Sequence, residues 1–183
     1  MAVRDVRIYP DPVLKQVAAP VGAVDAEART LARDLIDTMR AHERCVGIAA
    51  NQVGELRRCV VVDVSDHPRA VSCHGLLVLF DPVVLELRGS EVAREGCLSI
   101  PELTANVRRA TTVVVQGLDQ TGQALAVSAN AFEARALLHE IDHLDGVLFL
   151  DRVANLETDV FRRSSDAHSR RGGSGAQRPD TKA

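Results

Sequence analysis

The sequence predicts an α+β fold. Runs rich in valine and leucine, which are typical of β-strands, occupy the middle of the chain, and an amphipathic helix follows them. A turn-rich stretch between two of these runs is typical of a hairpin. The strands and helices do not alternate as they do in the βαβ units of a parallel sheet. This order favours α+β over a repeating βαβ sheet.

The amino-terminal part predicts an extended arm followed by a helix. The stretch "RIYPDPVLKQVAAPV" carries three prolines among apolar residues, a composition typical of a turn-rich extended segment. In the next stretch, "VDAEARTLARDLIDTMRAHERC", Asp25 can cap the N-terminus of a helix. Helical spacing then brings four apolar side chains onto one face, namely Leu31, Leu35, Ile36 and Met39.

Three segments in the middle of the chain predict strands. "RRCVVVDVS" (Arg57–Ser65) and "GLLVLFDPVVLEL" (Gly75–Leu87) are rich in Val and Leu. The pair Asp81-Pro82 is expected to break the second strand, because proline cannot donate a hydrogen bond to a neighbouring strand. The stretch "ATTVVVQGLDQTGQALAV" predicts a hairpin that turns between Asp119 and Gly122.

A second helix is predicted to carry the stretch "LLHEIDHLDG". Asn130, followed three residues later by Glu133, forms a candidate capping box at its start. Gly146 is well placed to end it. The apolar stripe between these ends consists of Phe132, Ala136 and Leu137.

The chain length suits one domain followed by a tail. A chain of 183 residues buries roughly 70% of its surface on folding, so it needs neither disulfides nor a structural metal. We assign residues 1–161 to a single domain. Residues 162–183 are polar with few large apolar groups, so we expect a disordered tail. The tail has six basic residues against two acidic ones, and the total charge of −3 leaves the domain at about −7.

Composition argues against nucleic-acid and membrane binding. The chain has no Trp and one Tyr, too few for a platform that stacks bases, and its net charge of −3 argues against specific DNA binding. No apolar run reaches the eighteen residues of a membrane span, and "MAVRDVRIYP" lacks the apolar core of a signal peptide. We expect a cytoplasmic protein with reduced cysteines, while an organellar location stays open.

The stretch "LLHEIDHLDG" contains the clearest chemical signal. On a helix, His139 and His143 lie one turn apart on one face and can bind a single metal ion. Two ligands are too few, and Cys97 in "REGCLSIPE" is a good third, because the glycine before it allows a tight turn that exposes a thiolate. Two imidazoles and one thiolate leave a fourth tetrahedral position for water, as in catalytic sites.

Two further side chains suit amide hydrolysis. Glu140 directly follows the first histidine, so it can take a proton from a metal-bound water and later deliver it to a leaving amine. In "CVGIAANQVG", Gly47 lets the backbone approach a ligand closely, and Gln52 supplies an uncharged NH2 donor for an oxyanion.

Together these motifs resemble those of peptide deformylases. The family's Gly-x-Gly-Leu-Ala-Ala-x-Gln element is similar to "CVGIAANQ". Its Glu-Gly-Cys-Leu-Ser element is present unchanged as "EGCLS", and its His-Glu-x-Asp-His-Leu element is present as "HEIDHL". In this combination and order the motifs are very specific. The resemblance runs from "YPDPVL" to "GVLFLDR" and leaves only the tail outside.

The resemblance implies a fold and a reaction. The implied fold is a single catalytic metallohydrolase domain over residues 1–161, with antiparallel β-sheets packed around a central helix that carries the HExxH motif. The implied reaction removes the N-formyl group from the formylmethionyl end of nascent polypeptides: a metal-bound water attacks the formyl carbonyl, Glu140 is the general acid/base, and formate is released. The implied cofactor is one Fe(II) ion per chain, for which Ni, Co or Zn can substitute.

The resemblance and the residue chemistry together assign the site. The implied metal ligands are Cys97, His139 and His143. The implied donors to the formyl oxygen are Gln52 and the backbone N–H of Leu98. The candidate substrate-binding residues are Val46, Gly47, Glu95, Gly96, Phe132 and Ala136. Among these, Val46, Phe132 and Ala136 form an apolar wall. The basic tail is a candidate contact to the ribosome.

Four positions depart from the family pattern. Cys45 replaces a glycine, Leu138 stands where glutamine is usual, Asp81 stands where asparagine is common, and Thr104 stands where many members have an arginine near the cleft. None removes a ligand or the acid/base, so we expect rate and substrate preference to change before activity is lost. Two alternatives stay open: an amidase or peptidase acting on another acylated amine, and a metal-binding module without turnover.

The other cysteines and histidines are given structural roles. We expect buried core thiols at Cys45, Cys59 and Cys73. We expect surface positions, with no partner pattern, at His42, His67, His74 and His168. Asp142 is offset from the ligand face, so it is expected at the surface or as a hydrogen-bond partner that orients a site residue.

Overall fold

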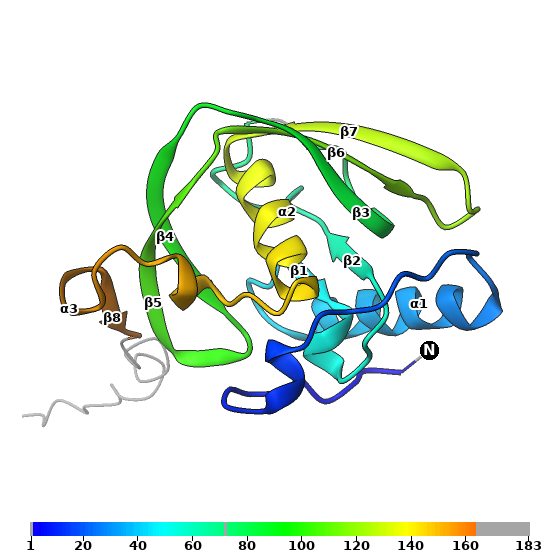
Figure 1. Ribbon diagram of the computed structural model, residues 1–183, viewed down its shortest axis with the longest axis horizontal. Coiled ribbons are helices and arrows are strands. Elements are labelled where there is room, and N and C mark those ends of the chain that lie inside the picture. The colour runs from blue at the N-terminus through cyan, green and yellow to red at the C-terminus, as the bar shows by residue number, and fades with distance from the viewer. Residues whose placement is uncertain (1, 72, 164–183) are drawn as a thin grey trace, which may run out of the picture.

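The computed structural model describes residues 2–71 and 73–163. It confirms the α+β prediction, with two antiparallel sheets and a central helix (Figure 1). The larger sheet has the strand order β1 (Gly47–Ala49), β2 (Cys59–Val62), β3 (Leu77–Arg88), β6 (Thr112–Leu118) and β7 (Ala124–Asn130). The smaller sheet consists of β4 (Glu91–Cys97), β5 (Ile100–Arg109) and β8 (Val160–Arg162). The helices are α1 (Ala26–Ala41), α2 (Ala131–Leu144) and the short α3 (Leu156–Asp159), with 3-10 turns at Pro12–Lys15, Ala50–Val53 and Phe149–Arg152.

The larger sheet lies between α1 and α2. Successive side chains of a strand point to opposite faces, so β2 places Val60 and Val62 against α2 and Val61 against α1. Leu137 and Ile141 of α2 are buried on the first of these faces. Figure 1 shows α2, in yellow, between the larger sheet and strands β4 and β5. This arrangement buries α2 on several sides and places its histidines near the end of β4.

The helix α1 and the β6–β7 hairpin form as predicted. Asp25 accepts a hydrogen bond from the backbone N–H of Ala28 at 2.7 Å, which caps the first turn of α1. The hairpin pairs Leu118 with Ala124, and the Asp119 carboxylate accepts backbone N–H bonds inside the turn. Both elements are specified by nearby residues, which explains why the sequence pattern found them.

The prediction that Asp81-Pro82 breaks a strand is wrong. Strand β3 continues through this pair, and the register shifts between Phe80 and Val83, which marks a bulge. A bulge accommodates a proline because its residues leave the regular hydrogen-bond ladder. Asp81 has a positive φ of 50°. Its carboxylate accepts hydrogen bonds from the backbone N–H groups of Val21 at 2.7 Å and Gly22 at 2.8 Å, so the bulge fastens the amino-terminal arm.

The predicted capping box of α2 is also wrong, although the helix has the expected ends. Asn130 occupies the N-cap position but makes no side-chain capping bond. The Glu133 carboxylate instead accepts hydrogen bonds from the backbone N–H of His74 at 2.8 Å and from its ring at 3.0 Å. The helix ends before Gly146, where φ is 69° and an added Cβ would lie 2.7 Å from the Lys15 carbonyl oxygen.

The predicted tail begins inside the described structure. Arg162 belongs to β8, which pairs with β5, and the backbone N–H of Arg163 donates to the Glu102 carbonyl at 2.7 Å. The rest of the predicted tail, with His168, lies outside the described residues. In the part of the chain that the structure describes, every helix is too short or too polar to span a bilayer.

Candidate metal centre and substrate cleft

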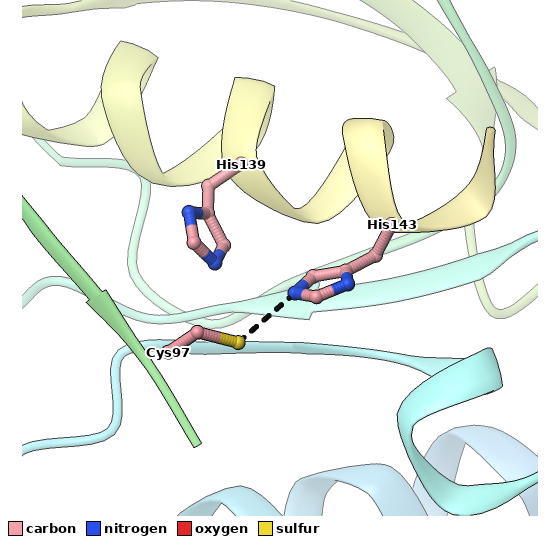
Figure 2. Close-up of side chains that lie close together, drawn as sticks. All are labelled: Cys97, His139 and His143. Atoms are coloured by element: carbon pink, nitrogen blue, oxygen red, sulfur yellow. Dashed lines mark hydrogen bonds between the residues drawn. The ribbon is translucent and has the colours of Figure 1, made fainter. Parts of the chain in front are cut away.

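The fold brings Cys97, His139 and His143 together, although 42 residues separate the cysteine from the first histidine. Cys97 is the last residue of β4, and the two histidines lie one turn apart on α2. Their ligand atoms all lie within 4.8 Å of one another, and Cys97 Sγ is 3.1 Å from His143 Nε2. Figure 2 shows both imidazole rings directed toward the sulfur. Among the described residues, no other group of three such side chains has this geometry.

The surroundings of Cys97 favour a thiolate. Burial opposes ionisation, but His143 and His139 hold the pKa of the thiol well below its ordinary value. The sulfur also accepts hydrogen bonds from the backbone N–H of Ser99 and from Gln52 Nε2, each at 3.4 Å. A buried thiolate beside two imidazoles is a donor set that suits a divalent transition metal.

Glu95 orients the first histidine. Its Oε2 atom lies 2.9 Å from His139 Nδ1, which leaves Nε2 of that ring facing the sulfur. Burial lowers the pKa of His139, but hydrogen bonds to Cys97 and Glu95 and the nearby charges raise it well above its ordinary value. A metal ion would replace the proton on Nε2, while Glu95 would keep the ring in place.

Two buried arginines hold the Glu95 carboxylate. Arg109 donates to it from Nε at 2.8 Å and from Nη2 at 3.0 Å, and Arg135 donates from Nη1 at 2.7 Å. Arg109 also donates to Asp142 at 2.5 Å, and Arg152 holds the other side of that carboxylate. Asp142 is therefore a buried group that orients the site through Arg109. Burial raises the pKa of Glu95, but His139 and Arg109 bring it far below its ordinary value.

Replacing Glu95 by Gln is expected to destabilise the metal-free protein by about 3 kcal/mol, because Arg109 and Arg135 would stay buried without their shared counter-charge. Metal affinity should also fall by about ten- to a hundredfold, because His139 loses its orienting carboxylate. Urea unfolding and metal titration measure the two effects. Glu91→Gln is the control, because Glu91 lies exposed on the same strand. Equal stability of the two variants would contradict this role of Glu95.

Glu140 lies beside the candidate ligands, and one oxygen of its carboxylate makes no hydrogen bond with the described residues. Its Oε2 atom is buried and has no hydrogen-bond partner among the described residues. Burial raises the pKa of Glu140 to about 7, against the opposing effect of both histidines. An added Cβ on Gly47 would lie 2.6 Å from Glu140 Oε1, so the lack of a side chain at Gly47 makes room for the carboxylate. The thiolate, two imidazoles and this open carboxylate therefore fit a bound metal.

A cleft with a volume of about 660 Å³, within the range of small-molecule sites, opens above these residues. Its wall includes all six candidate substrate-binding residues, together with Gln52, Leu98 and Glu140. One of the six, Glu95, uses its carboxylate in ion pairs with Arg109 and Arg135. Val46, Phe132 and Ala136 supply the apolar part. Leu98 lies in the turn between β4 and β5. Gln52 Oε1 accepts from the Ala49 backbone N–H at 2.9 Å, which points Nε2 toward Cys97 and Ser99.

The sequence reasoning missed part of the cleft. His67 was expected at the surface, but its ring stacks on Phe132 with the centroids 3.7 Å apart, and both line the cleft. Cys59 is a core thiol, as predicted, whereas Cys73 is exposed and Cys45 is half-buried in the cleft wall. Burial raises the pKa of Cys45 to about 12, and its thiol donates to the Gly47 carbonyl at 3.1 Å, so it is protonated.

Comparison with known proteins identifies the family. Residues 3–159 match the family model described as polypeptide deformylase. The chain is 39% identical to the peptide deformylase of Thermodesulfovibrio yellowstonii over 89% of this chain and 96% of that protein. It is 43% identical to the peptide deformylase of Desulfosudis oleivorans over 89% and 92%, respectively.

Solved structures agree with this match. The peptide deformylase of Ehrlichia chaffeensis in complex with actinonin superposes with a TM-score of 0.79 at 31% identity, covering 86% of this chain and 92% of that one. The peptide deformylase of Acinetobacter baumannii with Met-Ala-Ser bound gives a TM-score of 0.77 at 33% identity, covering 83% and 100%. With the family model matched along most of its length, this chain belongs to the peptide deformylase family, whose members are metal-dependent hydrolases.

Proposed function

We propose that this chain removes the formyl group from N-formylmethionyl peptides through the cleft above Cys97, His139 and His143. The observation that carries the proposal is the Glu140 carboxylate. It is buried, its pKa is raised to about 7, and one of its oxygens has no hydrogen-bond partner within residues 2–71 and 73–163. A carboxylate in this state can both accept and return a proton near neutral pH. A binding module without turnover would have no use for such a group.

The metal would be held by Cys97 Sγ and by the two histidines through Nε2. We propose Fe(II), one ion per chain, with Ni, Co or Zn as substitutes, because a thiolate and two imidazoles are ligands that these metals share. When bound, the ion supplies Lewis-acid activation of water and of the formyl carbonyl. Gln52 and Ser99 keep the sulfur in place, and Glu95 keeps His139 in place.

Glu140 would carry the proton between the two ends of the reaction. Its Oε2 atom takes a proton from the attacking water while a C–O bond forms at the formyl carbon. The same atom then delivers that proton to the amide nitrogen as the C–N bond breaks. The products are a free amino terminus and formic acid, which loses its proton to give formate, so water is the only other reactant. The buried position excludes bulk water, which would otherwise compete for the proton.

The remaining cleft residues would bind the substrate. Gln52 and Leu98 line the cleft near Cys97. The backbone N–H of Leu98, and Gln52 Nε2 in exchange for its hydrogen bond to Ser99, would donate to the formyl oxygen as negative charge develops on it. The apolar wall of Val46, Phe132 and Ala136 suits a methionine side chain. The relative from Acinetobacter baumannii binds Met-Ala-Ser, a peptide with this residue at its start. Gly47 and Gly96 also line the cleft, and we propose that they contact the peptide through their backbone, because Glu140 and Arg163 take up the space where side chains would lie.

Formate release from formyl-Met-Ala-Ser tests the proposal. Protein loaded anaerobically with Fe(II), or with Ni(II) or Co(II), is expected to release formate, and metal-free protein is not. Acetyl-Met-Ala-Ser and unblocked Met-Ala-Ser serve as controls, because an amidase for another acyl group would cleave the acetylated peptide. Release of acetate without formate, from folded and fully loaded protein, would replace the deformylase proposal by that amidase.

We also propose a cytoplasmic location, where Cys97 stays reduced and formylated nascent chains are available. The proposed contact of the basic tail with the ribosome concerns residues outside those that the structure describes, apart from the first two. It can be tested by comparing the co-sedimentation of full-length and truncated protein with ribosomes at low salt.

A further inference from the structure

Four exposed arginines line the same cleft, and we call them the arginine rim: Arg44, Arg69, Arg94 and Arg163. None of them forms an ion pair with a carboxylate of the described residues. Arg135, the other arginine in the cleft wall, is buried and is neutralised by Glu95. The rim arginines therefore present their charge to whatever enters the cleft.

Two of the rim arginines are held by aromatic rings. The Arg94 guanidinium lies 3.5 Å from the centroid of the Phe161 ring, and its Nη1 donates to Thr104 Oγ1 at 3.2 Å. Arg69 lies over the ring of Phe132 at 4.7 Å, on the wall proposed for the methionine side chain. Stacking leaves guanidinium N–H groups free to donate, so these charges are fixed in position without being neutralised.

Arg163 is the rim arginine that follows the last strand. It follows β8, and its backbone N–H donates to the Glu102 carbonyl at 2.7 Å, which fastens the segment to β5. Its guanidinium lies against Gly96, where an added Cβ would collide with Nη2. Gly96 and Arg163 both line the cleft, so this guanidinium stands at the cleft wall beside β4.

The acidic groups of the cleft do not balance this charge. The wall contains three glutamates. Glu95 is paired with Arg109 and Arg135, and Glu140 is assigned to proton transfer at the cleft floor. Among the residues that the structure describes in the cleft wall, Glu43 is left to face four arginines, in a chain whose net charge is −3. The rim is thus a local excess of positive charge on an acidic protein, and such an excess attracts negatively charged ligands.

We propose that the arginine rim makes this chain prefer N-formylmethionyl peptides with acidic residues shortly after the first two positions. The inference rests on the proposed deformylase function and names the substrate class of that same cleft. Once the formyl end lies at Glu140 and the methionine on its apolar wall, the following residues leave the cleft past the rim. Glutamate or aspartate side chains there can accept hydrogen bonds from guanidinium groups.

Three peptides test this preference. They are the C-terminal amides of formyl-Met-Ala-Glu-Glu, formyl-Met-Ala-Gln-Gln and formyl-Met-Ala-Lys-Lys, which differ in charge while the amide removes the terminal carboxylate. The acidic peptide should have the highest kcat/KM, by about two- to fivefold over the Gln peptide for each acidic residue, because exposed ion pairs are individually weak. The ratio should fall toward one in high salt, which screens exposed charges. The Lys peptide should be the poorest.

The variant Arg163→Gln should lower the Glu-to-Gln ratio of kcat/KM by about two- to fivefold, the effect of one exposed pair. Arg163→Lys should recover part of the ratio because it keeps the charge. Arg33→Gln is the matched control: it removes one exposed arginine from α1, outside the cleft, where Arg33 donates to Thr30 Oγ1 of its own helix. Its ratio should equal that of the parent protein.

The outcomes separate this inference from the proposed function. Turnover of the Gln peptide with equal or lower kcat/KM for the Glu peptide would overturn the acidic preference and leave the deformylase function standing. A preference that Arg163→Gln and Arg94→Gln both leave intact would also overturn the assignment to the rim. Absence of formate release from all three peptides by the folded, metal-loaded protein would contradict the proposed function itself.

Discussion

Glu140→Gln is expected to lower deformylation of formyl-Met-Ala-Ser by about a hundredfold or more while the protein keeps its metal. General acid/base groups commonly contribute rate factors of about 10² to 10⁴. Glutamine has nearly the same shape as glutamate but cannot accept the proton and return it. Because Glu140 is not among the candidate ligands, metal content should stay at one ion per chain. Formate release and metal analysis of the same preparation measure both quantities.

Glu102→Gln is a suitable control for Glu140→Gln. Glu102 is exposed on β5 and does not line the cleft, so this variant removes the same charge without touching the site. It should retain the parent activity and metal content. Activity of Glu140→Gln within tenfold of the parent would show that another group transfers the proton. Loss of metal from that variant would show instead that the carboxylate helps to hold the ion.

The fold could be predicted where neighbouring residues specify it. Asp25 and the apolar face of α1 lie within one helix, and the turn at Asp119 closes a hairpin between adjacent strands. The Asp81-Pro82 error has a tertiary cause. Asp81 tolerates a positive φ in β3 because its carboxylate binds the backbone of Val21 and Gly22, some sixty residues earlier. No local pattern contains that contact.

The candidate site could also be predicted where a local pattern specifies it. The prediction fails where a residue's role depends on contacts between distant elements. The candidate ligands could be predicted because two histidines at helical spacing, and a cysteine after a glycine, are visible in the sequence. The sequence assigns Glu95 to substrate binding, yet its charge is used by Arg109, Arg135 and His139. Those partners come from two other elements, so only the assembled fold reveals that role.

The arginine rim shows this limit most clearly. Its members come from the loop before β1, from the β2–β3 connection, from β4 and from the residue after β8. Arg163 lies in the segment that composition assigned to a disordered tail. Thr104 accepts a hydrogen bond from Arg94. The positive charge of the cleft therefore comes from positions spread along the chain, which no single motif contains.

Cys97→Ala is expected to remove both the metal and the activity, which distinguishes it from Glu140→Gln. The thiolate is the only anionic donor in the candidate ligand set, and two imidazoles alone bind a divalent ion weakly. We expect metal affinity to fall by more than about a hundredfold, beyond the usual effect of groups that merely orient a ligand. Formate release should drop to the level of metal-free protein. Equilibrium dialysis against Ni(II) or Co(II) measures the affinity.

Cys45→Ala is the matched control, because Cys45 is the other thiol in the cleft wall. Its thiol is protonated at neutral pH and donates to the Gly47 carbonyl, so it does not offer the ion a thiolate. This variant should keep one tightly bound ion per chain. If Cys97→Ala kept its full metal content and Cys45→Ala lost the metal, Cys45 would be the metal ligand in place of Cys97. Loss in Cys97→Ala alone, together with metal retained in Glu140→Gln, would separate the group that binds the ion from the group that moves the proton.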